Sequence, residues 1–486
     1  MGAVVDRSLA ARVPSTLSCD SRDCPAGALF FAVPGVRDDG TRFLADAARA
    51  GALAAVVGRD QEAAARSACS GLPLLVVPNV RLAKAQAAHA FHGDPSRALL
   101  SIGVTGTKGK TTTANYLHAL LDAAGLAPSL LGTIEERLFG QPARPSSHTT
   151  PDPLRLAALL AQARDAGGRS LAMEVSSHAL DQERVAGMRF RAALFTQLAR
   201  EHLDYHPTVE HYRDAKAKLF TMLAPDAFAV VNGEDRHALE LVAASRARLV
   251  TYGEVPGAHV RLARVEADVR GSRFELAIDG ALGGGRLLAA IALPGRHNLM
   301  NALAATAAAL ALELPRGAIA AGLAALRHVP GRLEPIDVGQ PFAVLVDYAH
   351  TDDALEKILR LLRPLTRGQL LTVFGCGGDR DRTKRPRMGR VAARWSDRTI
   401  VTSDNPRSED PAGIVAEIVA GLPCGAHAEV ELDRGRAIAR AIALAQPGDV
   451  VLIAGKGHED YQLVGSQKLP FDDRAVAREH LCRRSV

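Results

Sequence analysis

The sequence predicts an α/β protein of three domains with mostly parallel sheets covered by helices. First, the chain has 486 residues, and a prior of about 150 residues per domain favours about three cores over one. Second, short apolar runs alternate with longer helical patterns, as in residues 98–104, 111–124 and 170–175. Third, most of the unusual polar residues follow directly after a predicted strand, and the carboxyl edge of an open parallel sheet is where ligands bind.

Two turn-rich segments divide the chain, at residues 92–96 and at the Pro-Gly pair 330–331. The predicted domains are therefore 1–93, 94–331 and 332–486. Each domain contains apolar runs that predict strands. These runs are 28–33 and 53–57 in the first domain, 98–104, 170–175, 192–196 and 228–231 in the second, and 342–346, 370–374, 399–402 and 449–454 in the third.

The composition is typical of a soluble globular protein, with 47% hydrophobic and 23% charged residues. The net charge of +6 is spread among acidic residues, so no nucleic acid is expected as a partner. No apolar run is long and uninterrupted enough to predict membrane insertion. The six cysteines form no CxxC pair, which favours the reducing cytoplasm over a disulfide framework; they are Cys19, Cys24, Cys69, Cys376, Cys424 and Cys482.

A glycine-rich segment joins the strand ending at Val104 to a helical pattern. Its two glycines can bring backbone N–H groups toward phosphate oxygens, and its Gly-Lys-Thr triplet supplies a cation and a hydroxyl for Mg²⁺. The spacing departs from GxxxxGK[ST], because Val104 replaces the first glycine, and a simple turn carrying lysines is the alternative. The predicted ATP-binding residues here are Gly106, Thr107, Lys108, Gly109, Lys110, Thr111 and Thr112.

Eight motifs, in order along nearly the whole chain, resemble those of the Mur ligase family. They are Asp20-Ser-Arg22, the glycine segment, His148-Thr-Thr-Pro-Asp152, Glu174-Val-Ser-Ser-His178, His202-Leu-Asp-Tyr-His206, Asp347-Tyr-Ala-His350, Asp404-Asn-Pro-Arg407 and Gly455-Lys-Gly-His-Glu459. The resemblance implies a UDP-binding N-terminal domain, a central P-loop-like ATPase domain and a Rossmann-like C-terminal domain. It also implies a monomer that uses ATP to join meso-diaminopimelate to UDP-N-acetylmuramoyl-L-alanyl-D-glutamate in peptidoglycan synthesis.

The resemblance further implies a catalytic Mg²⁺ site. Glu174 is a hard oxygen ligand suited to Mg²⁺, and Thr111, His202 and Lys216 join it by resemblance, Lys216 as a carbamate. Lys110 completes the catalytic set. Charge pattern alone instead favours a solvated helix face for Lys216. Lys108, Gln197, Glu201 and Asp352 depart from the family's usual residues.

The substrate contacts are carried over from the same resemblance. For the UDP-muramoyl dipeptide they are Ser21, Thr149, Thr150, Ser176, Gln182 and Arg184. For ATP they add Asn298, Asn301, Arg332 and Asp347. For diaminopimelate they are Arg380, Asp404, Asn405, Pro406, Arg407, Gly455 and Glu459.

Arg407 is the residue that predicts the third substrate. A guanidinium can pair bidentately with the distal carboxylate of diaminopimelate and would repel the bare ammonium of lysine. An exposed Arg after an Asn-Pro turn is the simpler alternative. Two other functions remain open, namely a ligase of the same superfamily that adds another amino acid such as L-lysine, and a P-loop nucleotide switch without amide chemistry.

Overall fold

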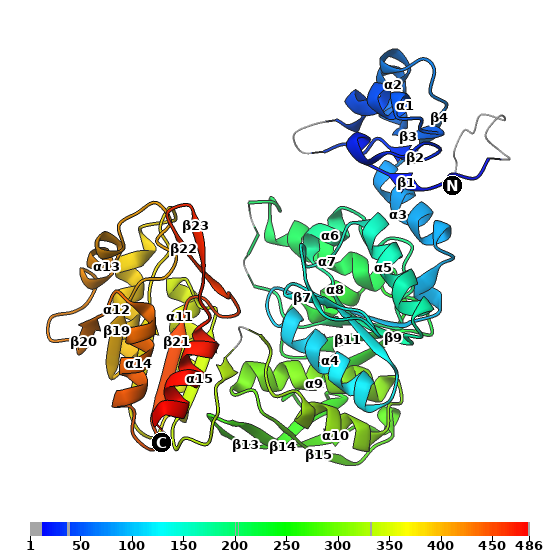
Figure 1. Ribbon diagram of the computed structural model, residues 1–486. Helices are drawn as coiled ribbons and strands as arrows, with labels where there is room; N and C mark the ends of the chain where they lie inside the picture. Colours follow the sequence, from blue (N-terminus) through cyan, green and yellow to red (C-terminus); the bar gives the residue numbers. More distant parts are fainter. Residues whose placement is uncertain (1–11, 36–38, 200, 203, 331–332, 485–486) are drawn as a thin grey trace. The chain divides into compact units, whose positions relative to one another are not determined.

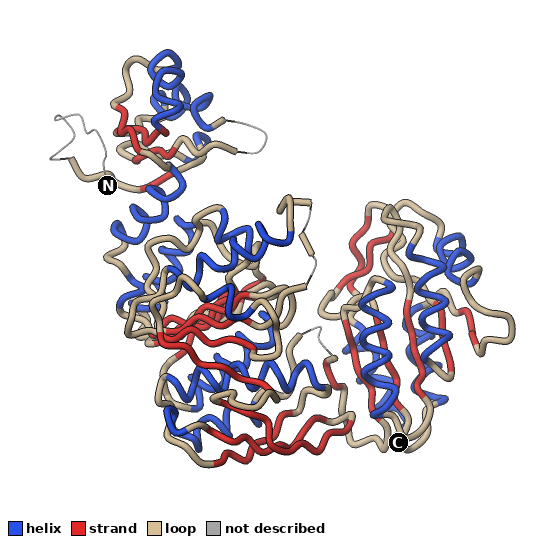
Figure 2. The backbone as a smooth tube through the Cα atoms, turned by 180° about the vertical axis from the view of Figure 1, so that it is seen from behind, coloured by secondary structure: helices blue, strands red, loops and turns tan. Residues whose placement is uncertain are grey.

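The computed structural model describes residues 12–35, 39–199, 201–202, 204–330 and 333–484. The chain divides into two compact units. The first contains the residues up to Val260 together with Ala304–Pro315, and the second contains Arg261–Leu303 and the residues from Arg316 onward. Figures 1 and 2 show the course of the chain through these units from opposite sides.

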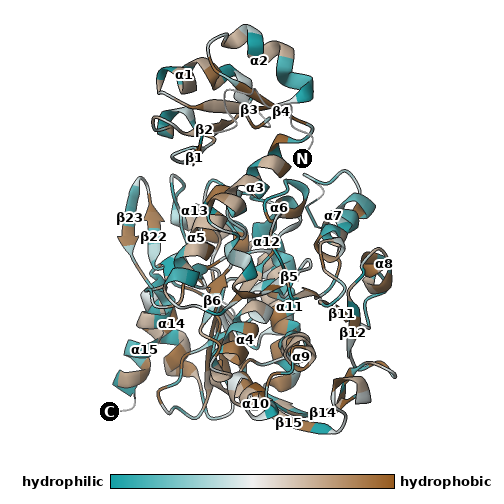
Figure 3. Cartoon of the chain, turned by 90° about the vertical axis from the view of Figure 1, so that its right-hand side faces the viewer, coloured by the Kyte–Doolittle hydropathy of each residue, from teal (hydrophilic) through white to brown (hydrophobic). Residues whose placement is uncertain are grey.

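The N-terminal part of the first unit is a small parallel sheet with helices packed on it. The strands lie in sequence order, β1 (Leu17–Ser18), β2 (Leu29–Phe31), β3 (Ala54–Gly58) and β4 (Leu74–Val77). The helices are α1 (Leu44–Arg49), α2 (Glu62–Ala68) and α3 (Val80–Phe91). Figure 3 shows hydrophilic residues along α2 and hydrophobic ones along β3, because the strand lies between the buried clusters of this sheet.

The rest of the first unit is built on a larger sheet in the order β12-β11-β10-β5-β9-β6-β7-β8. The first six strands are parallel neighbours and the last two are antiparallel additions. In sequence order they are β5 (Leu100–Thr105), β6 (Pro128–Leu131), β7 (Glu135–Arg137), β8 (Arg144–Pro145), β9 (Ser170–Glu174), β10 (Ala192–Phe195), β11 (Phe228–Asn232) and β12 (Arg248–Gly253). The carboxyl ends of β5, β9 and β10 therefore lie side by side, which is the edge predicted to bind ligands.

Helices cover this larger sheet. They are α4 (Lys110–Ala123), α5 (Pro153–Asp165), α6 (Ser177–Asp181), α7 (Val209–Thr221) and α8 (Ala238–Val242). The starts of α5, α6 and α7 are marked by side-chain caps, because Asp152, Ser176 and Thr208 each accept a hydrogen bond from a first-turn backbone N–H. Apolar residues of α5, α7 and α8 join those of β9, β10 and β11 in one buried cluster.

The second unit contains three neighbouring strands, a six-stranded sheet and a hairpin. β13 (Val260–Asp268), β14 (Gly271–Ile278) and β15 (Arg286–Ile291) are neighbours, with β14 and β15 antiparallel and α10 (Arg316–Ala325) packed on β15. Helix α9 spans Arg296–Ala311, with its residues up to Leu303 in the second unit and those from Ala304 in the first. The six-stranded sheet has the order β16-β17-β21-β18-β19-β20, and the hairpin pairs β22 (Tyr461–Val464) with β23 (Gln467–Pro470).

The six-stranded sheet is parallel apart from β16 at its edge. Its strands are β16 (Glu334–Pro335), β17 (Ala343–Asp347), β18 (Leu370–Phe374), β19 (Arg398–Val401), β20 (Ala428–Val430) and β21 (Val450–Ala454). Separate buried clusters on its two faces take apolar residues from α11 (Asp352–Leu362), α12 (Lys384–Trp395) and α13 (Pro411–Val419) on one side, and from α14 (Arg434–Leu444) and α15 (Asp473–Arg484) on the other. This is a doubly wound α/β arrangement.

The predicted strands all occur, with ends shifted by a residue or two. The strands β13 to β15 and the hairpin β22–β23 were not predicted. Strand β13 carries four charged residues and β23 is exposed throughout, so neither gives the continuous apolar run of a buried strand. Within the described ranges, no helix combines the length and the apolar character needed to cross a membrane.

Candidate active site

The glycine loop between β5 and α4 is shaped by its backbone. Gly106 and Gly109 have φ angles of 143° and 89°, a region that side chains other than hydrogen disfavour. A Cβ on Gly106 would lie 2.0 Å from the Thr196 hydroxyl oxygen. Position 106 therefore admits only glycine without rearrangement of β10's carboxyl end.

The loop ends where α4 begins, at Lys110. A helix N-terminus presents unpaired N–H groups and a partial positive charge, which favours a phosphate. The Lys110 ammonium donates to the carbonyl oxygens of Gly106 at 2.9 Å and Thr107 at 3.1 Å. The lysine is thus folded back over the loop, where its charge reinforces that of the helix N-terminus.

The loop is also tied to the segment that follows β10. Thr107 N donates to the Gln197 carbonyl at 2.8 Å, and the ammonium of Lys108 lies 2.6 Å from Glu201 Oε1. Lys108 and Glu201 are two of the departures from the family pattern, and here they pair with each other.

Glu174, at the carboxyl end of β9, is 1% exposed. It accepts hydrogen bonds from the Thr111 hydroxyl at 3.0 Å and from the Thr133 backbone N–H at 2.7 Å and hydroxyl at 3.0 Å. Thr133, which follows β6, was missed in the sequence, because one threonine in a loop carries no signal of its own. These contacts fix the orientation of the carboxylate.

The oxygen donors of Glu174 and Thr111 fit Mg²⁺, which binds through one or two protein oxygens plus substrate phosphates. Among the described residues, no group of three or more His, Cys, Asp or Glu side chains is gathered closely enough to hold a metal ion. An arrangement of this kind suits a cation that arrives with a nucleotide.

His202 has a φ of 59°, in the left-handed region. Its ring lies edge-on to His178, with centroids 5.1 Å apart. Burial lowers the pKa of His202, and the nearby ammonium groups of Lys110 and Lys216 lower it further. His202 makes no hydrogen bond to Glu174 or Thr111 among the described residues, so its predicted role as a ligand stays a prediction.

Lys216 lies on α7 and is 1% exposed. Its ammonium nitrogen donates to the Gly106 carbonyl at 3.0 Å and sits 4.3 Å from the centre of the Tyr212 ring. Burial lowers its pKa well below the usual value, and the charge of Lys110 lowers it further. The alternative of a solvated helix face is therefore wrong for Lys216, which reaches the underside of the glycine loop.

The residues predicted to contact the muramoyl dipeptide gather around the same edge. The Thr150 hydroxyl donates to the Glu174 carbonyl at 2.9 Å and accepts from Ser176 N at 3.1 Å. Arg184 donates to the Thr150 carbonyl at 2.9 Å and to Gln182 Oε1 at 2.8 Å. The Thr149 and Thr133 hydroxyls are 3.1 Å apart.

Ser21 lies in the N-terminal part of the first unit, after β1, where it begins the short 3-10 helix Ser21–Asp23 capped by Asp20. Its grouping with the other dipeptide residues stays a prediction. Lys84 of α3 pairs with Asp152 at 2.6 Å, and Asp152 caps α5. This ion pair links the helix that follows β4 to the loop that carries Thr149 and Thr150.

A cluster of histidines and tyrosines lies next to Lys216 and includes residues of the His202–His206 motif, for which no role of His206 was predicted. His206 is buried, with its Nε2 3.0 Å from the Ser177 hydroxyl and its Nδ1 3.0 Å from His211 Nδ1. Burial and the neighbouring His178 and His211 lower the pKa of His206 to about 4. A neutral imidazole therefore holds α6 against the start of α7.

The second unit brings most of the predicted diaminopimelate residues together at the carboxyl ends of β19 and β21. Asn405 Nδ2 donates to Glu459 Oε2 at 2.9 Å. Arg407, with a φ of 52°, donates to the Gly378 carbonyl at 2.8 Å. A Cβ on Gly455 would lie 2.6 Å from the buried, unpartnered Asp404 Oδ2. Arg380 is exposed on the neighbouring loop, and Pro406 lies between Asn405 and Arg407.

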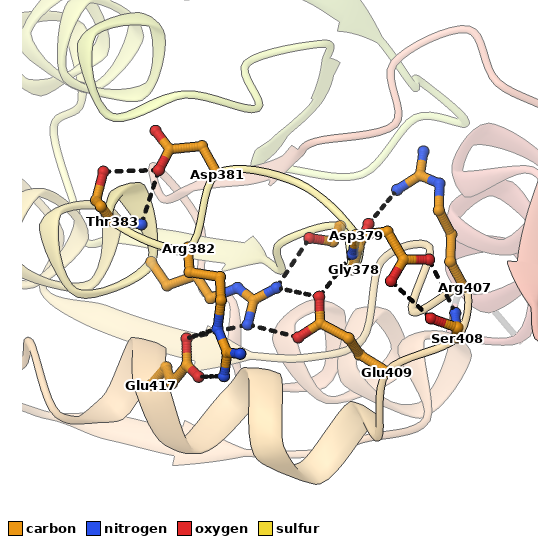
Figure 4. A network of polar contacts seen from close by, with 11 residues as sticks. Gly378, Asp379, Asp381, Arg382, Thr383, Arg407, Ser408, Glu409 and Glu417 are labelled. Carbon is orange, nitrogen blue, oxygen red and sulfur yellow. Dashed lines mark hydrogen bonds and ion pairs between the residues drawn. The ribbon is translucent and has the colours of Figure 1, made fainter.

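A network of charged side chains supports the loop that carries Arg407 (Figure 4). The buried Arg385 donates to both carboxylate oxygens of Glu409, at 2.9 and 2.8 Å, and to Glu417 at 3.0 Å. Hydrogen bonds from Arg385 and from the Asp379 backbone N–H lower the pKa of Glu409 to about 2. Asp379 also accepts from the Ser408 hydroxyl at 2.6 Å. None of these supporting residues was predicted.

Beneath the same loops lies a buried ion pair. Arg434 and Asp473 both have 0% side-chain exposure and are 2.7 Å apart. Arg434 also donates to the carbonyls of Ser403 at 3.3 Å and Ala454 at 3.0 Å. It therefore joins the ends of β19 and β21, and the segments that carry Asn405 and Glu459 follow these two strands.

The other predicted ATP contacts lie in the second unit. Asn298 is buried and donates to the Pro294 carbonyl at 2.8 Å, and Asn301 is buried one turn later on α9. Asp347 accepts from Leu333 N and Ala349 N, both at 2.8 Å. Arg332 lies outside the described residues. The roles of these four residues stay predictions.

A glycine loop between a parallel strand and a helix, with a lysine folded over it and a buried carboxylate beside it, defines a nucleoside-triphosphate-binding α/β protein. Three family models match successive parts of the chain, namely the Mur ligase family catalytic domain over residues 15–93, the Mur ligase middle domain over 104–309 and the Mur ligase glutamate ligase domain over 331–457. The chain belongs to the Mur ligase family. The predicted three-domain α/β architecture is thereby confirmed, whereas its residue boundaries stay a prediction.

Similar proteins agree with this assignment. A protein of Gloeobacter violaceus named UDP-N-acetylmuramoyl-L-alanyl-D-glutamate–2,6-diaminopimelate ligase is 47% identical over 96% of this chain and 94% of its own length. A Syntrophomonas wolfei protein of the same name is 42% identical over 96% and 94%. A solved structure with that name has a TM-score of 0.77 and 32% identity, and the match covers 97% of this chain and 96% of that one.

Proposed function

We propose that this chain joins meso-diaminopimelate to the D-glutamate γ-carboxylate of UDP-N-acetylmuramoyl-L-alanyl-D-glutamate, with ATP as the energy source. Relatives that match this chain over nearly their whole length carry the name of that ligase. The observation that carries the proposal is the gathering of Asn405, Arg407 and Glu459 at one sheet edge of a chain that also has the glycine loop. The reaction class is that of an ATP-dependent acid–amino-acid ligase.

The chemistry begins with a carboxylate, which is a poor acyl donor because its leaving group would be oxide. Transfer of the γ-phosphoryl group of ATP to a carboxylate oxygen gives an acyl phosphate and ADP. The α-amine of diaminopimelate then attacks the carbonyl carbon, the bond to phosphate breaks, and the amine proton is released. The products are the amide, ADP and inorganic phosphate.

In this proposal the glycine loop holds the triphosphate. Backbone N–H groups of the loop and of the α4 N-terminus bind phosphate oxygens, and Lys110 neutralises the charge that develops during transfer. Thr111 and Glu174 would hold Mg²⁺, which supplies electrostatic stabilisation of the transferring phosphoryl group. Thr133 keeps the Glu174 carboxylate turned toward Thr111.

We also propose that Lys216 is carbamylated in the active enzyme. An amine must be neutral to react with CO₂, and burial next to Lys110 favours the neutral form. The resulting carbamate would be an anion below the glycine loop, where two lysines and the loop carbonyls now meet. Isotope-labelled bicarbonate, followed by NMR of the protein, should give a carbamate signal that is absent from a Lys216→Arg variant.

In this proposal, the amino-acid subsite presents opposite charges to the carboxylate and the ammonium on the distal carbon of diaminopimelate. Arg407 and the exposed Arg380 are cations for the distal carboxylate, and Glu459 and Asp404 are acceptors for the distal ammonium. We place the reaction in the cytoplasm, where ATP and UDP-linked precursors are found, and propose a monomer. All six cysteines are free thiols, which is compatible with that compartment.

The test is a phosphate-release assay with ATP, Mg²⁺ and the UDP-muramoyl dipeptide, run with single amino acids. We expect release to depend on meso-diaminopimelate, and mass spectrometry to detect the UDP-muramoyl tripeptide. Stronger activity with L-lysine or L-ornithine, which end in an ammonium alone, would show that one of these amino acids is the substrate in place of diaminopimelate. No amide product with any amino acid would refute the ligase function and leave the nucleotide switch.

A further inference from the structure

Lys456 is a buried lysine among the diaminopimelate residues that the proposed mechanism does not use. It follows β21 and has 0% side-chain exposure. It stands between Gly455 and Gly457, whose φ angles of 118° and 54° lie in the region that favours glycine. A Cβ on Gly457 would lie 2.7 Å from the Tyr348 Cβ. This tight turn directs Lys456 inward rather than to solvent.

Within the described ranges, the ammonium of Lys456 donates to two polar partners, and both belong to the predicted subsite. It lies 3.2 Å from Asn405 Oδ1 and 3.2 Å from Glu459 Oε2. Asn405 in turn donates from Nδ2 to the same Glu459 oxygen at 2.9 Å. The three side chains thus close a triangle of hydrogen bonds, in which Lys456 holds the other two in one orientation.

The triangle leaves the two oxygens of Glu459 in different states. Oε2 accepts from both Asn405 and Lys456, while Oε1 accepts no hydrogen bond from any residue in the described part of the chain. Oε1 is therefore the oxygen available to an incoming ammonium. Its direction is set by the two donors that fix Oε2.

The charge balance of the subsite also depends on Lys456. The charges of Lys456 and Glu459 cancel at 3.2 Å. Of the other charged residues of the proposed subsite, Asp404 offsets one of the two cations Arg380 and Arg407, so a surplus of one positive charge remains. A distal end that carries both a carboxylate and an ammonium is neutral as a whole, and its carboxylate can pair with this surplus. An amino acid that ends in an ammonium alone meets net repulsion.

We propose that Lys456 is a positioning residue that orients Glu459 and balances its charge, and that it thereby sets the preference for amino acids whose distal end carries a carboxylate. This inference rests on the proposed function. It adds a determinant of selectivity, located below the subsite, to the cation Arg407 that contacts the ligand.

The first experiment compares kcat/KM for meso-diaminopimelate and L-lysine in wild type and Lys456→Met. We expect the KM for diaminopimelate to rise about 10- to 100-fold, as for the loss of a charged hydrogen bond. The KM for ATP should stay within about twofold, and use of lysine should hold or rise because Glu459 is no longer neutralised. The ratio of the two kcat/KM values should fall by at least about tenfold. An equal loss with both amino acids would assign Lys456 a merely structural role and overturn the inference.

The matched control is Lys468→Met. Lys468 lies on β23 and faces the same Tyr461 ring as Lys456, at 4.0 Å compared with 5.4 Å, but it is exposed and contacts neither Asn405 nor Glu459. Its substitution should leave the selectivity ratio unchanged. A change as large as that of Lys456→Met would attribute the effect to the ring and overturn the inference.

A double variant keeps the test decisive if Lys456→Met does not fold. Glu459→Gln alone leaves the buried ammonium without its counter-ion and should reject both amino acids. Adding Lys456→Met removes that charge, so the double variant should recover at least about tenfold in kcat/KM for lysine over Glu459→Gln. A double variant that is no better than Glu459→Gln would overturn the inference. Failure of wild type to ligate diaminopimelate would instead refute the proposed function.

Discussion

The glycine loop of the first unit is positioned differently from the predicted diaminopimelate residues Asn405, Arg407 and Glu459 of the second unit, called here the amino-acid cluster. The glycine loop is one continuous segment, and its shape comes from backbone angles at Gly106 and Gly109 and from the start of α4. The amino-acid cluster brings together segments that are about fifty residues apart, such as Asn405 and Glu459, which are joined by side chains. A local site of the first kind can be recognised from one segment, whereas a site of the second kind is divided between two motifs whose contact the sequence does not reveal.

The largest effect is expected where the amino-acid cluster depends on its buried ion pair. Removing one partner of such a pair costs about 3–5 kcal/mol, so Arg434→Met should lower the free energy of unfolding by that amount in urea denaturation. The double variant Arg434→Met with Asp473→Leu should recover much of the loss, because no buried charge remains unpaired. Equal stability of wild type and Arg434→Met would show that the cluster does not depend on this pair.

Substitutions in the glycine loop should instead lower the catalytic rate rather than the stability of the fold. Lys110→Met removes the cation over the loop, and we expect kcat to fall about 100- to 1000-fold, as for the loss of one preorganised charge donor. Lys108 was also predicted to bind ATP, but its exposed side chain pairs with Glu201. Lys108→Met should therefore lower kcat by no more than about fivefold, because exposed ion pairs contribute about 1 kcal/mol or less. Steady-state phosphate release measures both, and similar losses in the two variants would contradict the distinction.

An intermediate effect is expected for the cation of the amino-acid cluster. Arg407→Ala should raise the KM for meso-diaminopimelate about 10- to 100-fold, while the KM values for ATP and the UDP-muramoyl dipeptide stay within about twofold. Arg407→Lys should recover only part of the loss, since an ammonium cannot form the planar two-point contact with a carboxylate. Unchanged diaminopimelate kinetics in Arg407→Ala would refute the assignment.

The smallest effect is expected from the charged network behind Arg407. The pKa of Glu409 is lowered from 4.5 to about 2 by the hydrogen bonds from Arg385 and Asp379. A lowered carboxylate pKa stabilises the fold above the unfolded-state value, and this contribution is lost as the pH falls from about 4.5 toward 2. Glu409→Gln should therefore be less stable near neutral pH and should show a shallower loss of stability in that window. Parallel pH profiles of the urea midpoint would argue against it.

Much of the fold was predictable because apolar runs followed by glycine turns specify parallel strands locally, as for residues 100–105 and 370–374. The glycine loop was predictable for the same reason. Lys216 shows the limit of such patterns, since its neighbours suggest a solvated face and only the packing of α7 under the loop buries it. Thr133, Arg385 and Arg434 lack a local signal, because their roles come from contacts between segments distant in sequence. Lys456 lies inside the Gly455–Glu459 motif, but its role comes from its contact with the distant Asn405.

The backbone conformation of Arg407 depends on the hairpin β22–β23. Arg407 N donates to the Leu463 carbonyl at 3.0 Å, and Gly465 N donates to the Arg407 carbonyl at 2.7 Å, so the tip of the hairpin holds the left-handed backbone of Arg407 from both sides. The hairpin is largely exposed and outside the buried clusters of its sheet. Changes in the length or the turn of the hairpin can therefore reorient the Arg407 guanidinium without disturbing the core. Natural or engineered variation at this hairpin is thus expected to change the amino acid that the enzyme accepts while the fold remains stable.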